Sequence, residues 1–143
     1  MLDTTHHIPV LLDEVINSLS LKDEGFYVDA TFGLGGYSKE ILSKRNCNLL
    51  AIDRDPEAKK FAQPIQSCFK DKFTFVNGRF SELIKFLEDK NINKVNGIVF
   101  DLGVSSPQLD KKERGFSFKS DGPLDMRMSL EGPTAEEFIN KVE

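Results

Sequence analysis

Four short apolar segments separated by helix-like stretches constrain the fold of this chain more than any other feature. Each segment is rich in β-branched and aromatic residues and is almost continuously apolar, which is typical of a strand buried on both faces. The segments are residues 26–31, 48–53, 73–78 and 97–102. Such strands alternating with helices predict an α/β fold with a parallel sheet and right-handed crossovers.

Three helices are expected between these strands. One covers about residues 36–43, and the third begins near Ser81. The second is expected to start at Pro56, because Asp55 is a good N-cap and proline suits the first helical position. Pro64 should break or kink this second helix, since proline donates no backbone hydrogen bond.

The two ends of the chain lie outside this repeat. Residues 10–19 predict an amphipathic helix, and the capping box from Thr134 to Glu137 predicts a last one. Residues 105–133 hold six glycines and prolines in all and are expected to be irregular, either functional or mobile. We expect a first domain over 1–108, and an irregular loop with the start of a helical insert over 109–143. Four strands make half a sheet, so the chain is expected to be part of a longer protein; a small complete domain is the alternative.

Composition excludes several classes of protein. Apolar residues make up 39% of the 143, which is too many for a disordered chain. The net charge of −4 argues against a strongly basic nucleic-acid-binding protein, although a local basic face stays open. The basic residues of 111–114, with Lys119 and Arg127, could contact phosphates, but a solvated loop is the simpler interpretation.

Neither a metal site nor a membrane span is expected. Cys47 and Cys68 stand alone, without CxxC spacing, which favours a reducing compartment. The adjacent His6 and His7 indicate an exposed terminus. No apolar run is long enough to cross a membrane, and the first residues do not form a signal peptide. A soluble, cytoplasmic protein is predicted.

The first chemical motif is a glycine turn after the first strand. Gly33, Gly35 and Gly36 allow a sharp turn and bring backbone N–H groups close to a ligand, at the N-terminus of the following helix. The spacing is G-x-G-G, and Ser38 stands where a dinucleotide-binding motif has its third glycine. An ordinary strand-to-helix turn is the structural alternative.

The second motif is Asp53, twenty positions after Gly33 at the end of the second strand. An acid at this distance binds the two hydroxyls of a ribose; an exposed strand end is the alternative. The combination of a glycine turn with such an acid occurs in both nicotinamide dehydrogenases and S-adenosylmethionine (SAM) methyltransferases. Ser38 argues against a pyrophosphate site. Asp29 is expected to place a carboxylate beside the cofactor, which suits the positive charges of SAM. SAM is therefore favoured.

Two further loops follow the third and fourth strands. Phe80 is predicted either to lie against an adenine ring or to be a core residue. Asp101 could accept a hydrogen bond from an amino group of the cofactor or of a nucleobase, and Gln108 adds a polar group to the same loop. A plain turn is the alternative for Asp101.

These motifs resemble the RsmH (MraW) family of methyltransferases. The matching runs are residues 7–14, 29–36, 51–56, 101–110, 114–118 and 121–128. The resemblance implies a class I SAM-methyltransferase fold, a Rossmann-like sheet with a helical domain inserted after the fourth strand. It also implies methylation of the exocyclic N4 of a cytidine in small-subunit ribosomal RNA. The cofactor-binding positions that it implies are Gly35, Gly36, Tyr37, Asp53, Phe80, Asp101 and Gln108, to which the glycine turn adds Gly33.

This chain departs from the family pattern in two respects. Tyr37 stands where the family usually has histidine, so a backbone contact is kept and an imidazole role is lost. Family members also continue well past residue 143. Asp101 is the predicted catalytic residue, as the acceptor for the reacting amine, and a backbone carbonyl within residues 101–106 is the alternative acceptor. The partner would be small-subunit RNA or the assembled small ribosomal subunit, and a homodimer is open. The alternatives are a truncated chain that binds SAM without activity, a nicotinamide-dinucleotide oxidoreductase, and a non-catalytic RNA-binding module.

Overall fold

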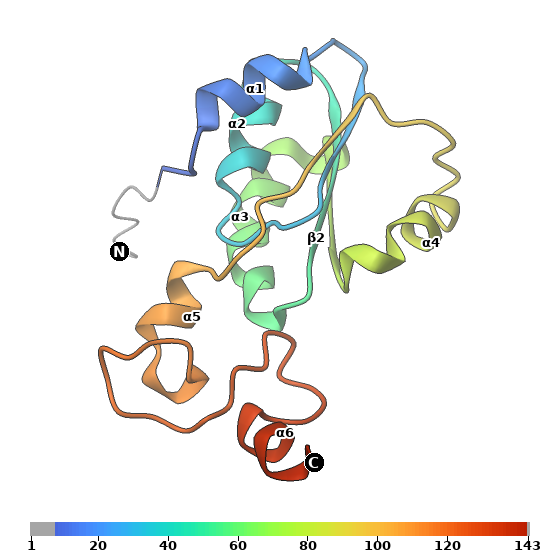
Figure 1. The fold of residues 1–143 in the computed structure, drawn as a ribbon. Coiled ribbons are helices and arrows are strands. Elements are labelled where there is room, and N and C mark those ends of the chain that lie inside the picture. The colour runs from blue at the N-terminus through green and yellow to red at the C-terminus, as the bar shows by residue number, and fades with distance from the viewer. Residues whose placement is uncertain (1–7, 143) are drawn as a thin grey trace.

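The computed structural model describes residues 8–142 (Figure 1). Its strands are β1 Phe26–Asp29, β2 Asn48–Asp53, β3 Phe73–Asn77 and β4 Gly97–Val99. Its α-helices are α1 Leu12–Leu19, α2 Gly36–Lys44, α3 Lys59–Phe69, α4 Leu83–Glu88, α5 Ser106–Asp110 and α6 Ala135–Lys141. Four short 3₁₀ turns are η1 Pro56–Ala58, η2 Lys70–Lys72, η3 Phe80–Glu82 and η4 Lys112–Arg114.

The four strands form one parallel sheet in the order β3-β2-β1-β4, as the sequence predicted. Val28 of β1 lies between Leu50 of β2 and Ile98 of β4. Three of the strands end one to three residues earlier than expected, because the chain leaves the sheet there to form loops. One such loop is held by the Asp101 N–H, which donates to the Thr31 hydroxyl (2.7 Å).

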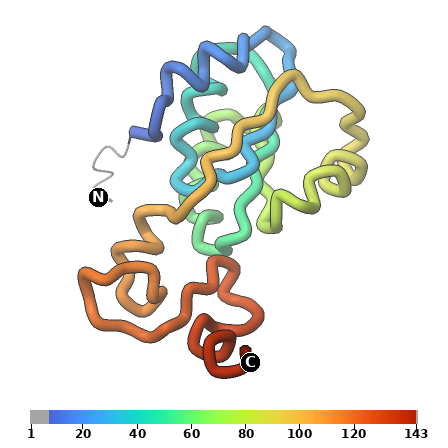
Figure 2. The backbone as a smooth tube through the Cα atoms, in the orientation of Figure 1, coloured from blue at the N-terminus to red at the C-terminus, as the bar shows by residue number. Residues whose placement is uncertain are grey.

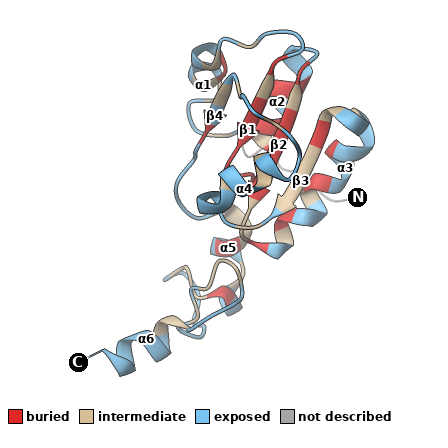
Figure 3. Cartoon of the chain, turned by 90° about the vertical axis from the view of Figure 1, so that its right-hand side faces the viewer, coloured by how far each residue is buried: buried red, intermediate tan, exposed pale blue. Residues whose placement is uncertain are grey.

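Neighbouring residues of each strand point to opposite faces of the sheet, so the core has two parts. Tyr27 packs with residues of α1, α2 and α3, whereas the adjacent Val28 packs with residues of α4. These two groups of helices lie on opposite sides of the sheet (Figures 1 and 3). Both side chains are fully buried. Each such side chain contributes roughly 1.5–3 kcal/mol on transfer from water. The central strands are thereby rigid enough to fix the loops at their ends.

The expected break at Pro64 does not occur. Helix α3 continues through this residue, from Lys59 to Phe69. Pro64 itself is exposed, whereas Ala62 and Ile65 are buried against the sheet. Packing of this apolar face therefore outweighs the lost backbone hydrogen bond. The expected start is confirmed: the Asp55 side chain accepts from the Glu57 N–H (3.0 Å) at η1.

The expectation of a wholly irregular segment over 105–133 is wrong in part, since it contains α5 and η4. A capping box starts α5, in which the Ser105 N–H donates to the Gln108 side chain (3.0 Å). The predicted box at Thr134 and Glu137 is confirmed at the start of α6. This C-terminal part lies beyond the carboxyl ends of the strands, away from α1 (Figure 2).

Candidate functional site

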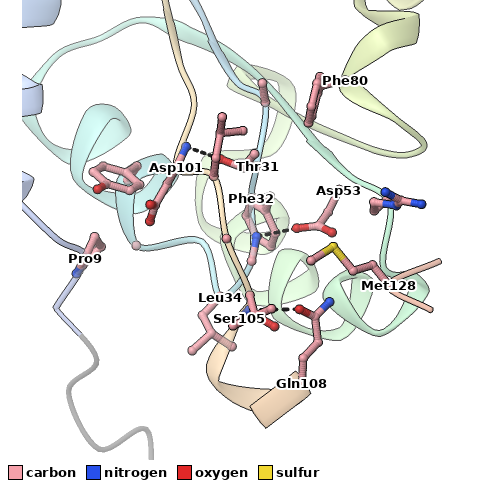
Figure 4. Close-up of a pocket in the computed structure, with 18 of the residues that line it drawn as sticks. Pro9, Thr31, Phe32, Leu34, Asp53, Phe80, Asp101, Ser105, Gln108 and Met128 are labelled. Carbon is pink, nitrogen blue, oxygen red and sulfur yellow. Dashed lines mark hydrogen bonds between the residues drawn. The ribbon is translucent and has the colours of Figure 1, made fainter. Parts of the chain in front are cut away.

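A cavity of about 610 Å³ lies at the carboxyl ends of the strands. The sheet order changes direction between β1 and β4, and ligands of open α/β sheets bind at such a switch point. Of the predicted cofactor-binding residues, those that line the cavity are Gly33, Gly36, Tyr37, Asp53, Phe80, Asp101 and Gln108. The fold therefore brings together in one place residues that span most of the chain (Figure 4).

Gly35 does not line the cavity, although it was predicted to bind the cofactor. It is the N-cap of α2 with φ +80°, a conformation that favours glycine. A Cβ at this position would lie 2.6 Å from the Phe32 ring and 2.7 Å from Cδ1 of Ile65. Gly35 is therefore needed for the turn and for core packing, and its contact with the cofactor stays a prediction.

Asp53 faces the glycine turn, as the twenty-residue spacing predicted. Its Oδ2 accepts from the Gly33 N–H (2.6 Å), and its Oδ1 accepts from the Asp55 N–H (2.8 Å). Burial raises the pKa of Asp53, and these backbone donors oppose the rise. Each oxygen keeps further lone pairs, so the carboxylate is held in one orientation and can still accept from two neighbouring hydroxyls.

The expectation that Asp29 places its carboxylate beside the cofactor is wrong. Asp29 is fully buried and does not line the cavity. Its oxygens accept from the Ser38 hydroxyl (2.7 Å) and the Thr31 N–H (3.3 Å). Burial raises the pKa of Asp29 to about 6, despite these donors. Asp29 thus ties β1 to the first turn of α2, a role hidden from the sequence because the spacing does not show which way the side chain points.

Asp101 and Tyr37 lie on the same cavity. Among residues 8–142 the Asp101 carboxylate makes no hydrogen bond, so it is free to accept one from a ligand. Burial, and then the negative charges of Asp101 and Asp29, raise the pKa of Tyr37. The Tyr37 hydroxyl donates to the backbone carbonyl of Val10 (2.5 Å). The side chain that replaces the family's histidine therefore holds the N-terminal segment.

Phe80 and Gln108 have different environments. Phe80 is 44% exposed, which excludes the core interpretation, and its ring meets that of Phe100 edge-on at 5.5 Å. Gln108 is buried, and its Nε2 donates to Oδ2 of Asp55 (2.9 Å). Phe80 therefore offers an open aromatic ring, whereas the Gln108 amide is largely engaged within the protein.

The sequence did not point to several residues that line the cavity, among them Pro9, Arg54, Arg79 and Met128. Pro9 packs on Gly36, where an added Cβ would overlap its ring. His6 and His7 lie outside the described residues. Within 8–142, no three His, Cys, Asp or Glu side chains are grouped to hold a metal ion. No helix in the same range has the length and apolar character needed to cross a membrane.

A model of the MraW methylase family matches residues 4–143, nearly the whole chain. The chain belongs to the MraW methylase family. This confirms the resemblance seen in the sequence motifs, and with it the class of fold: a Rossmann-like α/β methyltransferase sheet.

Curated relatives are named ribosomal RNA small subunit methyltransferase H. The protein of Rhodospirillum rubrum is 46% identical over 139 residues, covering 97% of this chain and 43% of the relative. That of Rickettsia massiliae is 53% identical over 137 residues, covering 96% and 44%. That of Zymomonas mobilis is 50% identical, covering 96% and 41%. The chain spans less than half the length of these relatives.

Proposed function

We propose that the cavity binds SAM and that the protein acts in methylation of the exocyclic N4 of a cytidine in small-subunit ribosomal RNA. The observation that carries the proposal is the pairing of Gly33 with Asp53 across the ends of β1 and β2. Membership of the MraW methylase family and the names of the relatives support it. Because the chain spans less than half of those relatives, methyl transfer by these 143 residues is a separate question from SAM binding.

The adenosine part of SAM is assigned to Asp53 and Phe80. The Asp53 carboxylate is fixed by two backbone donors, so binding a ribose requires little further ordering. Its remaining lone pairs accept from the two ribose hydroxyls. The exposed ring of Phe80 provides a flat apolar surface for the adenine.

Asp101 is assigned to the reacting end of the cavity. When bound, SAM supplies a methyl group on a positively charged sulfur, which is already a good leaving group. The Asp101 carboxylate accepts a hydrogen bond from the cytidine N4 amine, orients its lone pair, and stabilises the positive charge that develops on nitrogen. The N–CH₃ bond forms as the S–CH₃ bond breaks, and the proton of the methylated amine then leaves to water.

Two contacts argue for SAM over a nicotinamide dinucleotide. Ser38, in place of the third glycine, is buried and bonded to Asp29. Pro9 packs on Gly36 at the start of α2, where a pyrophosphate would need to approach the helix N-terminus. Because Asp29 does not line the cavity, we assign the interaction with the positive charges of SAM to the Asp101 carboxylate.

Calorimetric titration of the chain with SAM and with NADH tests the binding proposal. We expect SAM to bind and NADH not to bind. Asp53→Asn should weaken SAM at least tenfold, whereas the matched control Asp71→Asn, at an exposed site in η2, should leave it unchanged. Binding of NADH alone would support the oxidoreductase alternative and overturn the proposal.

Transfer of a labelled methyl group from SAM to small-subunit RNA, free or in assembled subunits, tests the activity. Asp101→Ala should abolish transfer wherever the unsubstituted protein shows it. SAM binding without transfer would identify the 143 residues as a binding unit that lacks activity. Sedimentation at several concentrations tests the homodimer, and fractionation of cells tests the cytoplasmic location; both remain predictions.

A further inference from the structure

Arg114 is a buried cation in the segment that was expected to be a solvated loop. Its side chain is 5% exposed. Its Nη2 forms an ion pair with Oδ2 of Asp55 (2.9 Å), and its Nη1 donates to Oε2 of Glu57 (3.0 Å). It also donates to the backbone carbonyls of Arg127 (3.2 Å) and Met128 (3.1 Å). One guanidinium thus joins the turn after β2 to a segment more than ten residues further along the tail.

Asp55 connects this network to the Asp53 carboxylate. The Asp55 N–H donates to the Asp53 carboxylate, while Oδ2 of Asp55 accepts from the Gln108 amide and forms an ion pair with Arg114. The same buried carboxylate therefore contacts two separate parts of the tail, α5 and η4. A change in the position of α5 or η4 would therefore act on Asp55, two residues from Asp53, the predicted ribose-binding acid.

The tail supplies part of the cavity wall through this network. Met128 and Gln108 both line the cavity, and Figure 4 shows the Met128 side chain between those of Asp53 and Gln108. Gln108 bonds Asp55 directly, whereas Met128 is tied to it by Arg114. The strand order alone would leave this side of the cavity open.

A buried ion pair is a costly way to pack two segments together. Removing each charge from water costs several kcal/mol, and an apolar contact of similar size often gives equal stability. The planar guanidinium instead fixes direction, because it binds several acceptors at once in set geometry. Nη1 and Nη2 of Arg114 contact four oxygen atoms at 2.9–3.2 Å on two segments, residues 55–57 and 127–128, whereas Nε has no partner among the described residues.

Resting on the proposed function, we propose that Arg114 is a positioning residue that holds Met128 and its segment against Asp55 and so completes the wall of the SAM cavity beside Asp53. Lysine in its place keeps the charge, but its single nitrogen cannot contact all four oxygen atoms. Glutamine removes the charge. Lys111 offers a matched control, since it contacts Glu57 from a more exposed position in the same tail.

The test combines two measurements on the chain. Hydrogen–deuterium exchange over residues 124–130 is followed without ligand, and the SAM dissociation constant is measured by calorimetry. Arg114→Gln should accelerate exchange at least fivefold and weaken SAM at least tenfold. Arg114→Lys should weaken SAM at least threefold, and Lys111→Gln less than twofold. Val28→Ala, in the core under α4, should lower the melting temperature and leave both measurements unchanged.

Unchanged exchange and affinity in Arg114→Lys and in folded Arg114→Gln would overturn the proposal. So would an equal loss of affinity in Val28→Ala, because the effect would then be general instability. If Arg114→Gln does not fold, Arg114→Lys decides alone. If the unsubstituted chain fails to bind SAM, the proposed function falls, and the exchange measurement still decides whether Arg114 holds this wall.

Discussion

Replacing Gly35 by alanine tests whether this residue is retained for packing or for ligand contact. Its φ of +80° lies in the left-handed region, where an added Cβ costs roughly 1–2 kcal/mol. The new methyl would also lie 2.6 Å from the Phe32 ring and 2.7 Å from Ile65. Both neighbours are buried, and overpacking of this kind costs about 1–3 kcal/mol. The free energy of unfolding should therefore fall by roughly 2–5 kcal/mol.

Gly33→Ala is the matched control for this experiment. Gly33 also has a positive φ, +54°, but the nearest atom to an added Cβ is the Thr31 carbonyl oxygen at 4.0 Å. Only the conformational cost of roughly 1–2 kcal/mol then remains. Urea unfolding followed by circular dichroism gives both values. Equal losses for the two variants would refute the assignment of Gly35 to core packing.

Three further predictions concern stability. Pro64→Ala should raise the melting temperature, because it restores a backbone donor within α3 at an exposed position. The free energy of unfolding should rise by about 2 kcal/mol, after subtraction of the higher entropy that alanine gives the unfolded chain. An unchanged melting temperature would contradict this prediction. Tyr37→Phe removes the hydrogen bond to Val10 and should accelerate proteolytic cleavage within residues 8–11. The free energy of unfolding should fall by at most about 1 kcal/mol. Identical cleavage rates in the two proteins would show that this hydrogen bond does not hold the N-terminal segment. Burial raises the pKa of Asp29 from its ordinary 3.8 to about 6, so the folded state binds more protons than the unfolded state between these values. Stability should therefore fall as the pH rises from about 4 to 6, by roughly 3 kcal/mol, and Asp29→Asn should flatten that slope in urea unfolding; an unaltered slope would count against this origin.

Strands, most helix starts and the pairing of the glycine turn with Asp53 could be predicted because local patterns encode them. Residues 49–52 are apolar throughout, since a central parallel strand is buried on both faces. Gly33 and Asp53 are recognisable because the length of a strand–helix–strand unit fixes their spacing, and the structure places them 2.6 Å apart, N to O. Family membership followed from the same runs of residues.

Some predictions failed where the outcome depends on packing between distant segments. Pro64 is a strong helix breaker in isolation, yet the buried face of α3 keeps the helix continuous. Asp29 looked like a ligand contact because it precedes the glycine turn, but the pleat of β1 turns its side chain into the interior toward Ser38. A sequence pattern shows that a residue is polar and near a strand end, not which side of the chain it faces.

The sequence by itself determined the parallel sheet, the glycine turn and the acid opposite it, because each depends on residues within a strand–helix–strand unit. Only the tertiary structure decided that the tail forms a wall of the same cavity. Arg114 reaches Glu57 across 57 positions, and Gln108 reaches Asp55 across 53. No local periodicity records such a pairing, because a charged side chain has the same sequence signature in water as in a buried ion pair, and burial by distant segments alone distinguishes the two.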